Sequence, residues 1–299
     1  MKVCVTGAAG FLGRHVYHAL TSAGHTVISL DFQWEEPLTS SQASHTIMAD
    51  ITKPLRKIDG LDAVIHLAAV ASPRECDSDP TKAFDVNVNG TMQVLRMALE
   101  SGAKKVVFSS TGHVYNIPPL YQPTDETHPL RLNNTYTTSK ILGEQLCELF
   151  WDNHGLEYTT LRLFNVYGEG QRPGYFIPDQ LAKAKTGRIE LRGANTTKDW
   201  VYVDDVVQAF VKALDTNYVG AVNIGTGIET ELKTIGEFIA DAARCDFTQM
   251  SDPNPTRMCA DIRRAERVLG WRPEVRYAQL AALMAKTDFE RISQLPTRY

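Results

Sequence analysis

The chain has 299 residues, enough to bury a large core, and a formal net charge of −4. This charge gives no basic surface of the kind that binds nucleic acid or an anionic membrane, so we expect neither partner. Five scattered cysteines without paired metal-ligand spacing predict reduced thiols in a cytoplasmic protein and no metal site. We expect no signal peptide, because the first residues already read as a core strand, and no membrane span, because no apolar run approaches about 20 residues.

The first 31 residues predict a strand, a helix and a second strand. Residues 2–6 form a short apolar run stopped by a glycine, which is typical of a buried parallel strand. Leu12, Val16 and Leu20 recur at helical spacing, and Gly24 is placed to end that helix. A second apolar run over residues 26–30 closes the unit, with an aspartate at its carboxyl end.

The turn between the first strand and the helix carries Gly7, Gly10 and Gly13. Gly7 would allow a tight turn, Gly10 would let the backbone approach a phosphate, and Gly13 would let the helix pack closely on the strand. Unpaired N–H groups at the positive end of a helix suit the pyrophosphate of a dinucleotide. Asp31 lies roughly 20 residues beyond the glycines, where a carboxylate accepts hydrogen bonds from an adenosine ribose.

The residues after Asp31 favour NAD over NADP. Residues 32–36 read FQWEE, with no arginine or lysine to hold a ribose 2′-phosphate, and Glu35 and Glu36 would repel one. The glycine spacing, G-x-x-G-x-x-G, resembles that of the short-chain dehydrogenase/reductase superfamily. NAD is therefore the expected cofactor.

Further short apolar runs predict the remaining strands, over residues 47–49, 63–69, 104–109, 157–164 and 219–224. Asp50 follows the first of these runs, and either a contact with the adenine or a role in a turn or helix cap would explain it. His66 lies inside an apolar run and is interpreted as a core histidine rather than a ligand or base. Ala68 and Ala69 are small enough for a cofactor to lie against the backbone.

Two long helices are predicted between these strands. The first covers residues 80–102, with one apolar face formed by Phe84, Val88, Met92, Leu95 and Leu99. The second begins at residue 135 and extends to residue 153. Tyr136 and Lys140 are four residues apart, so both project from one face of that helix. Taken alone, such a pair is common on exposed helices.

The composition changes after residue 164, where a loop rich in glycine begins. An amphipathic segment is predicted over residues 178–186, an acid-capped helix near Asp204, and further helices over 234–245 and within 260–273. We expect an NAD-binding domain over residues 1–164 with a return segment at about 199–225. Residues 165–198 and 226–299 would form a substrate-binding lobe over the carboxyl edge of the sheet.

Seven motifs follow one another along the chain: GAAGFLG, SSTGHVY, YTTSK, LRLFNVYGEGQRP, KDWVYVDD, NIGTG and ADIRRAERVLGWRP. With them the chain resembles the extended short-chain dehydrogenases known as NAD-dependent epimerase/dehydratases, the group that contains UDP-glucose 4-epimerase. The resemblance covers nearly the whole chain. It implies an α/β fold with a Rossmann-type, doubly wound parallel sheet and a smaller C-terminal substrate-binding lobe.

The resemblance also implies roles for individual residues. Tyr136 would be the catalytic acid/base, Lys140 would bind the nicotinamide ribose, and Thr111 would be the catalytic serine or threonine of the family. The implied cofactor-binding residues are Gly7, Gly10, Phe11, Leu12, Gly13, Asp31, Asp50, Ile51, Leu67, Ala68, Ala69, Asn87, Ser109, Tyr136 and Lys140. The implied substrate-binding residues are Ser110, Thr111, His113, Asn165, Lys198 and Arg257.

The implied chemistry requires a tyrosine that ionises readily. An unperturbed tyrosine has a pKa of about 10, and both the Lys140 ammonium and a positive nicotinamide ring would favour the phenolate. Tyr136 would then take the proton of a substrate hydroxyl oriented by Thr111 while hydride passes to NAD. The resulting ketone would be reduced from its other face, would undergo elimination or decarboxylation, or would leave as product.

The chain departs from the family pattern at positions that affect the reaction and the substrate. Family dehydratases carry an Asp-Glu pair after the catalytic threonine, and decarboxylases carry a Glu two places on, whereas Gly112 and His113 stand here. His113 has either a structural role or a role as a proton donor. Lys198 replaces an arginine that usually grips the nucleotide diphosphate, and Arg257 is the nearest candidate for a second one, usually near Ser251.

We therefore predict an NAD-dependent epimerase, specifically a 4-epimerase, of nucleoside-diphosphate sugars that acts through a transient keto intermediate. The alternatives are an NAD-dependent dehydrogenase, keto-reductase or dehydratase that acts on a nucleotide sugar or on a smaller hydroxy substrate. A homodimer is also expected, because the family pairs two helices of each subunit, here residues 80–102 and 135–153, into a four-helix interface.

Overall fold

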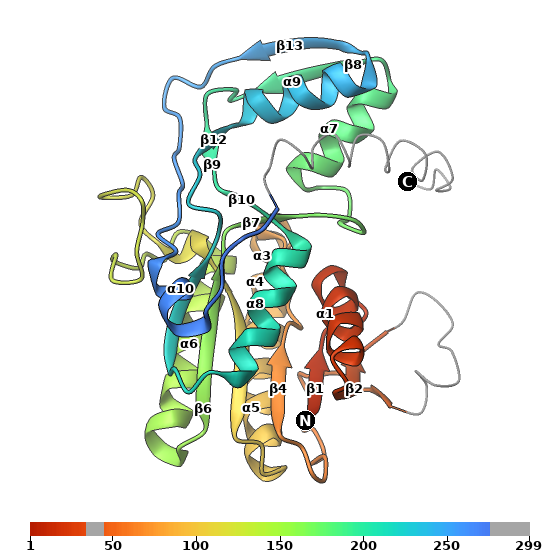
Figure 1. The fold of residues 1–299 in the computed structure, drawn as a ribbon, viewed down its shortest axis with the longest axis vertical. Coiled ribbons are helices and arrows are strands. Elements are labelled where there is room, and N and C mark those ends of the chain that lie inside the picture. The colour runs from red at the N-terminus through yellow and green to blue at the C-terminus, as the bar shows by residue number, and fades with distance from the viewer. Residues whose placement is uncertain (34–44, 276–299) are drawn as a thin grey trace.

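The computed structural model describes residues 1–33 and 45–275, and a parallel sheet forms its centre (Figure 1). The seven strands lie in the order β11–β6–β5–β4–β1–β2–β3. They are β1 (Lys2–Thr6), β2 (Thr26–Asp31), β3 (Thr46–Met48), β4 (Ala63–His66), β5 (Lys105–Thr111), β6 (Glu157–Leu163) and β11 (Gly220–Ile224). The strand order reverses between β1 and β4, and ligands of such sheets bind beyond the carboxyl ends of the strands at that point. The predicted Rossmann-type fold is confirmed.

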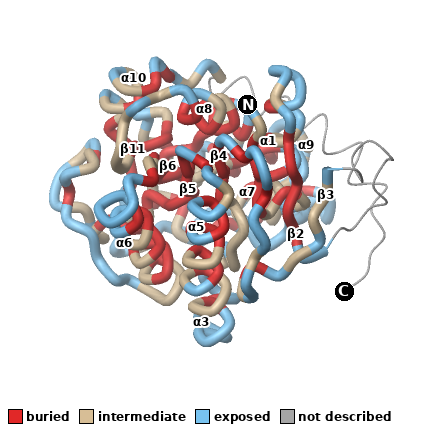
Figure 2. Tube along the Cα trace, turned by 90° about the horizontal axis from the view of Figure 1, so that it is seen from below, coloured by how far each residue is buried: buried red, intermediate tan, exposed pale blue. Residues whose placement is uncertain are grey.

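Helices cover both faces of the sheet, which explains why most residues of its central strands are buried (Figure 2). One face carries α1 (Phe11–Ser22), α8 (Val203–Asp215) and α10 (Arg263–Leu269). The other carries α5 (Gly90–Glu100) and α6 (Thr135–His154), with the short α3 (Pro73–Ser78) beside them. The short α4 (Pro80–Phe84) contacts both α3 and α6. Alternate residues of β1 point into the two layers, so Val3 and Val5 pack with α1 and α8, whereas Cys4 packs with α5 and α6.

The helix predicted over residues 80–102 is interrupted by a π-helical turn. This turn, η1 (Asp85–Asn89), separates α4 from α5. The widened turn changes which side of the helix faces the sheet, so the predicted apolar stripe is only partly correct. Leu95 is buried as predicted, but Leu99 is 36% exposed, and the buried position in the π turn is Asn87 at 2%.

Two other predicted boundaries are wrong. The strand predicted over residues 63–69 ends at His66, because the next residues bend toward β1 and bond to Thr6. The N-cap of α8 is Tyr202 rather than an acid, and Asp204 lies within the first turn of the helix. There its charge still complements the positive end of the helix.

A smaller lobe lies above the carboxyl edge of the sheet (Figure 1). It contains α7 (Phe176–Lys185) and α9 (Leu232–Ala243), packed on the parallel pair β8 (Arg188–Arg192) and β13 (Asp246–Met250). Two short strand pairs join it to the sheet region: β7 (Asn165–Tyr167) with β10 (Trp200–Tyr202), and β9 (Thr197–Lys198) with β12 (Thr230–Glu231). None of the helices in residues 1–33 and 45–275 has the length and apolar character needed to cross a membrane.

Candidate active site

The turn between β1 and α1 is shaped by its glycines. Gly7 has a φ of +70°, and a Cβ at this position would lie 2.7 Å from the backbone nitrogen of Ala68. A Cβ on Gly13 would lie 2.1 Å from the carbonyl oxygen of Gly7, so α1 can start this close to β1 only with glycine there. Gly10 is the N-cap of α1 and offers no side-chain cap to the first N–H groups. These features form a cradle that fits a dinucleotide pyrophosphate, with Phe11 and Leu12 as its first helical residues.

Asp31 closes this turn from the end of β2. Its carboxylate is only 8% exposed and accepts hydrogen bonds from the backbone nitrogens of Ala9 (2.9 Å) and Phe32 (2.8 Å). The carboxylate therefore lies beside the glycine turn, where an adenosine ribose would meet it. Glu35 and Glu36, which were also predicted to repel a 2′-phosphate, lie outside the described residues.

The segment after β4 forms the opposite wall. The backbone nitrogens of Leu67 and Ala68 both lie 3.2 Å from the hydroxyl oxygen of Thr6, to which they donate. These bonds hold the segment, which continues through Ala69, against the end of β1. Because Ala68 and Ala69 have small side chains, the backbone of this wall lies directly beside the glycine turn, and a Cβ on Gly7 would lie 2.7 Å from the Ala68 nitrogen.

Asn87 anchors the same wall from η1. Its amide oxygen accepts from the backbone nitrogen of Val70 (2.8 Å), and its amide nitrogen donates to the Val70 carbonyl (3.0 Å) and to the Ser139 hydroxyl (2.9 Å). Both amide hydrogens are thus engaged by the protein. Asn87, implied by the resemblance to contact the cofactor, here ties the wall to the helix that carries Tyr136 and Lys140.

His66 is a core histidine, as predicted. It is 1% exposed and hydrogen-bonds to Thr6 (2.6 Å) and Thr91 (3.0 Å). Burial, with the charge of Lys140 acting in the same direction, lowers the pKa of His66 to about 3. The ring is therefore neutral at pH 7.

Asp50 and Ile51 make structural contacts. The Asp50 carboxylate accepts a hydrogen bond from the backbone nitrogen of Thr52 at 2.9 Å, which is the turn role, one of the two explanations given for this residue. Ile51 is buried, and a Cβ on Gly90 would lie 2.7 Å from its Cδ1. Its side chain belongs to the core beneath the site.

The predicted catalytic residues meet at the carboxyl end of β5. Thr111 ends that strand and shares a side-chain hydrogen bond with Tyr136 in the first turn of α6. The Lys140 ammonium donates to the carbonyl of Ser109 at 2.8 Å and lies 5.1 Å from the centre of the Phe108 ring. Hydrogen bonding and a cation–π contact therefore place Lys140 beside the same strand end as Thr111.

Burial controls the ionisation of these residues. It raises the pKa of Tyr136, as do the neighbouring Tyr175 and Cys76, while the bond to Thr111 lowers it. The folded chain alone therefore does not lower the pKa of Tyr136 as predicted, because desolvation is the largest effect on that group. Burial lowers the pKa of Lys140 to about 8, and nearby acidic groups, Cys76 and Glu144 first among them, oppose that change.

Three predicted substrate residues come together next to Thr111. His113 lies in the 3-10 turn η2 (Gly112–Val114) and shares a side-chain hydrogen bond with Asn165. The positive charge of Lys198 is close enough to lower the pKa of His113. Burial is the main reason that the pKa of His113 falls to about 4, so its ring is neutral at pH 7. The Lys198 ammonium lies 3.3 Å from the sulfur of Met258, and burial lowers its pKa to about 8.

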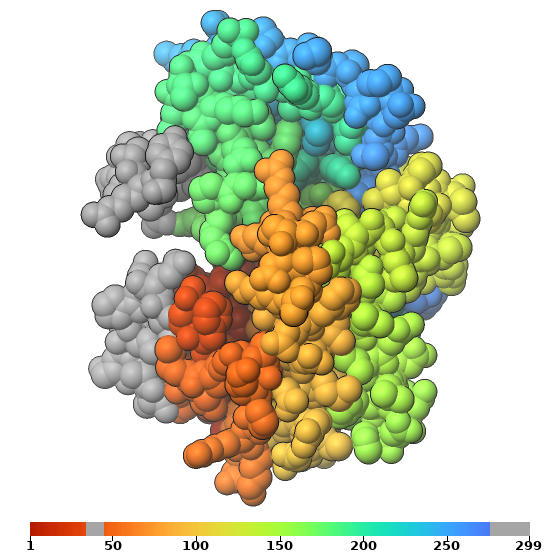
Figure 3. All heavy atoms as spheres, turned by 180° about the vertical axis from the view of Figure 1, so that it is seen from behind, coloured from red at the N-terminus to blue at the C-terminus, as the bar shows by residue number. Residues whose placement is uncertain are grey.

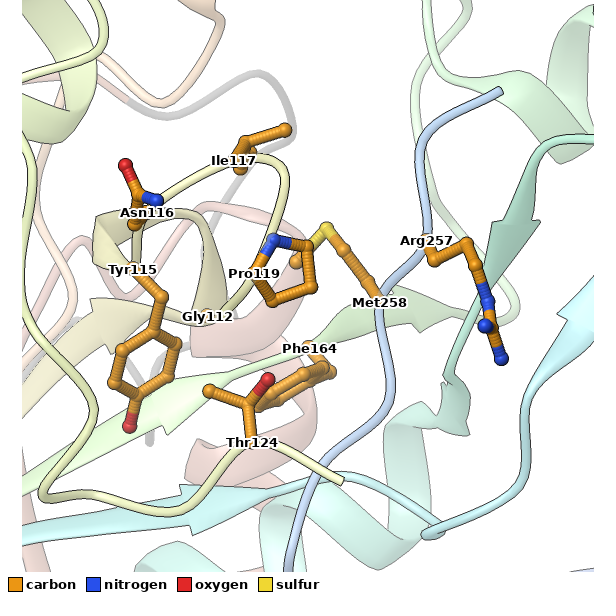
Figure 4. Close-up of a pocket in the computed structure, with 9 residues that line it drawn as sticks. All are labelled: Gly112, Tyr115, Asn116, Ile117, Pro119, Thr124, Phe164, Arg257 and Met258. Atoms are coloured by element: carbon orange, nitrogen blue, oxygen red, sulfur yellow. The ribbon is translucent and has the colours of Figure 1, made fainter. Parts of the chain in front are cut away.

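The other two predicted substrate residues point elsewhere. Ser110 is 2% exposed and donates to Oε1 of Glu144 at 2.5 Å, so its hydroxyl faces the core. The guanidinium of Arg257 is exposed and bonds both oxygens of Glu229, at 2.6 and 2.5 Å. Arg257 borders a small pocket near Thr111, and its side chain points away from the others that line the pocket (Figure 4). A phosphate would have to compete with Glu229 for this arginine.

Two residues that organise the site were missed in the sequence. Glu144 and Arg162 form a buried ion pair beneath Ser110, with Nη2 and Oε2 2.6 Å apart. Signals for both were present, because Glu144 follows Lys140 by four residues and Arg162 lies between two leucines near the end of a predicted strand. Their pairing joins different elements, which a local pattern does not specify.

Comparison with known proteins agrees with this geometry. The model of the NAD dependent epimerase/dehydratase family matches residues 3–225. A UDP-glucose 4-epimerase of Mycolicibacterium smegmatis is 33% identical over 306 residues, covering 93% of this chain and 96% of that protein. UDP-glucuronic acid decarboxylase 3 of Arabidopsis thaliana is 28% identical over 317 residues, covering 99% and 91% respectively.

A solved structure gives the same result for the fold. The UDP-glucose 4-epimerase of Thermus thermophilus, in complex with NAD, superposes with a TM-score of 0.84 at 26% identity, covering 96% of this chain and 98% of that one. The glycine cradle and Asp31 also fit this cofactor. The chain therefore belongs to the NAD dependent epimerase/dehydratase family, as an enzyme of the extended short-chain dehydrogenase type with NAD as its cofactor.

Proposed function

We propose that the protein is a 4-epimerase of a nucleoside-diphosphate sugar that works through a transient keto intermediate. The observation that carries the proposal is the meeting of Thr111, Tyr136 and Lys140 beside a cradle that fits NAD. The bacterial relatives named UDP-glucose 4-epimerase support a nucleotide sugar as substrate and epimerisation as the reaction. Lys198 supplies a cation for a diphosphate beside His113, whereas Arg257 is bound to Glu229 and would have to leave that carboxylate to contribute.

Each residue has a distinct part in this mechanism. The Thr111 hydroxyl orients the reacting hydroxyl of the sugar, and Tyr136 accepts its proton and later returns it. Lys140, held by Ser109, places positive charge beside the site and favours the tyrosinate when it forms. NAD, when bound, takes up and gives back the hydride, and its positive ring also lowers the cost of ionising Tyr136.

A second candidate is decarboxylation or dehydration of the keto intermediate. The Arabidopsis relative named a decarboxylase gives this candidate its support. The residues after Thr111 oppose it, because Gly112 and His113 provide no carboxylate and the His113 ring is neutral at pH 7. A net dehydrogenase or keto-reductase uses the same three catalytic residues and differs only in releasing NADH or the ketone.

The reaction can be assigned by incubating the enzyme and NAD with UDP-, dTDP-, GDP- and CDP-hexoses and following the products by NMR. We expect at least one hexose to equilibrate with its 4-epimer, with no net NADH and no keto-deoxy product. Accumulation of a 4-keto-6-deoxy sugar or stoichiometric formation of NADH would contradict the epimerase proposal. Inactivity across the panel would direct attention to substrates that lack a nucleotide.

The cofactor preference provides a direct test of Asp31. NAD should bind more than about tenfold more tightly than NADP, because a 2′-phosphate would meet the Asp31 carboxylate. Asp31→Asn removes the charge but keeps the shape, so it should narrow that gap mainly by improving NADP binding. Calorimetry measures both dissociation constants, and equal affinities for the two cofactors in the wild type would refute the assignment.

Tyr136→Phe should lower kcat by about 10²- to 10⁴-fold, because only the proton-transfer group is lost. The affinity for NAD should remain nearly intact. Lys140→Met should weaken both turnover and NAD binding, since it removes the ammonium beside the ribose position. Steady-state kinetics and calorimetry on both variants check this split, and full activity of Tyr136→Phe would show that the tyrosine has no catalytic part.

We also propose that the protein is a cytoplasmic homodimer. The segments α4 to α5 and α6 lie side by side on one face of the molecule (Figure 3). Helices α5 and α6 leave apolar side chains in solvent, including Leu99 (36% exposed), Leu149 (48%) and Trp151 (38%). The five cysteines are free thiols, which suits a reducing compartment. A monomeric mass by light scattering at micromolar concentration would exclude the dimer.

A further inference from the structure

The ion pair beneath the active site is almost completely withdrawn from water. The side chains of Glu144 and Arg162 are 10% and 7% exposed. Nε of Arg162 lies 3.0 and 3.2 Å from the two carboxylate oxygens, and Nη2 lies 2.6 Å from Oε2. The arginine fork therefore binds the carboxylate with a fixed geometry, which a lysine could not reproduce.

This pair attaches α6 to the catalytic end of β5. One turn of α6 is held by the bond from Lys140 to the Ser109 carbonyl. The next turn is held by the bond from the Ser110 hydroxyl to Glu144. Two successive turns of the helix are thus fixed to the two residues that precede Thr111, and this fixes the position of Tyr136 relative to Thr111.

The network continues beyond the pair. Nη1 of Arg162 donates a hydrogen bond to the Tyr115 hydroxyl at 3.1 Å. That hydroxyl donates in turn to the side-chain oxygen of Asn223 in β11 at 2.5 Å. Tyr115 directly follows the turn that carries His113. The same pair therefore links α6, the ends of β5 and β6, and the segment after η2 through a continuous chain of buried hydrogen bonds.

Glu144 is also the carboxylate whose charge raises the pKa of the Lys140 ammonium. The titratable groups around the Lys140 ammonium are His66 on β4, Cys76 on α3, and Glu144 and Cys147 on its own helix. His66 is neutral at pH 7, and burial raises the pKa of both thiols, so these groups carry no negative charge there. Glu144, which forms the ion pair with Arg162, is the one carboxylate in this set.

Stability alone does not account for such a pair. Withdrawing two charges from water costs free energy, and well-packed apolar side chains of similar volume often stabilise a core as well or better. What an apolar pair lacks is the directional bonding to Ser110 and the negative charge near Lys140. Both features act on the catalytic residues.

We propose that Glu144, held by Arg162, is a positioning residue of the active site. It fixes α6 against the end of β5 and keeps Lys140 in its ammonium form at working pH. Glu144 touches neither substrate nor cofactor in this role and acts through Lys140 and Ser110. The inference rests on the proposed function in one respect, that Tyr136 and Lys140 carry the chemistry.

The test is Glu144→Gln, which keeps the size and the acceptor for Ser110 but removes the charge. Because the carboxylate raises the pKa of Lys140, its loss should move the deprotonation of Lys140 to lower pH. An NMR titration of the Lys140 amine follows this directly, and the alkaline limb of the kcat profile should move with it. The KM for the sugar nucleotide should stay nearly constant.

Glu148→Gln is the matched control, since Glu148 lies one turn further along α6 and is exposed. It should leave both the titration and the profile unchanged. If Glu144→Gln folds poorly, Glu144→Gln combined with Arg162→Gln removes the unpaired buried charge and is titrated instead. An unshifted Lys140 titration in the folded variant overturns the inference. The titration needs no substrate, so it remains decisive even if the wild type epimerises no nucleotide sugar and the proposed function fails.

Discussion

The close packing of α6 on β5 is the constraint on which the active site depends. A Cβ on Gly143 would lie 2.5 Å from the tip of the Phe108 ring, so the helix can approach the strand this closely only with glycine at that position. One turn earlier on the helix, the Lys140 ammonium lies over the same ring and bonds the strand's backbone. The helix brings Tyr136 and the strand brings Thr111. Their meeting is therefore a consequence of backbone distance, which packing sets before any charge is considered.

Burial then shifts the pKa values of the titratable side chains in the active site. It raises the pKa of Tyr136 and lowers those of Lys140, His113 and Lys198, so each group is shifted toward its neutral form. A site of this kind responds strongly to any charge that enters it, because the surroundings screen charges poorly. The positive ring of NAD and the negative diphosphate of a sugar nucleotide are charges of this kind.

Much of this arrangement follows from local sequence patterns. The glycine turn, Asp31 and the Tyr136–Lys140 spacing each lie within one short segment whose backbone geometry dictates the residue types. The parallel sheet follows from apolar runs that alternate with helices. His66 could be assigned to the core because its neighbours along the chain are apolar.

The features that were not predictable depend on contacts between distant segments. The π turn at Asp85–Asn89 places Asn87 toward Val70, which the amphipathic pattern of the helix does not indicate. The Ser110 hydroxyl faces the core because it donates a hydrogen bond to the carboxylate of Glu144 on α6. Arg257 forms an ion pair with Glu229, a glutamate 28 residues earlier in the chain. Hydrogen-bonding partners of polar side chains are chosen by the fold as a whole, so the role of a single polar residue is the least certain part of a sequence-based prediction.

The central claim is that hydride leaves a sugar carbon and returns to the same carbon through tightly held NAD. It is tested most directly with a nucleotide hexose that carries deuterium at C4, converted in ordinary water and analysed by NMR. The account predicts that the 4-epimer retains its deuterium at C4, because the hydride is stored on the cofactor and never exchanges with solvent. Replacement of the deuterium by solvent hydrogen at that carbon would contradict the account.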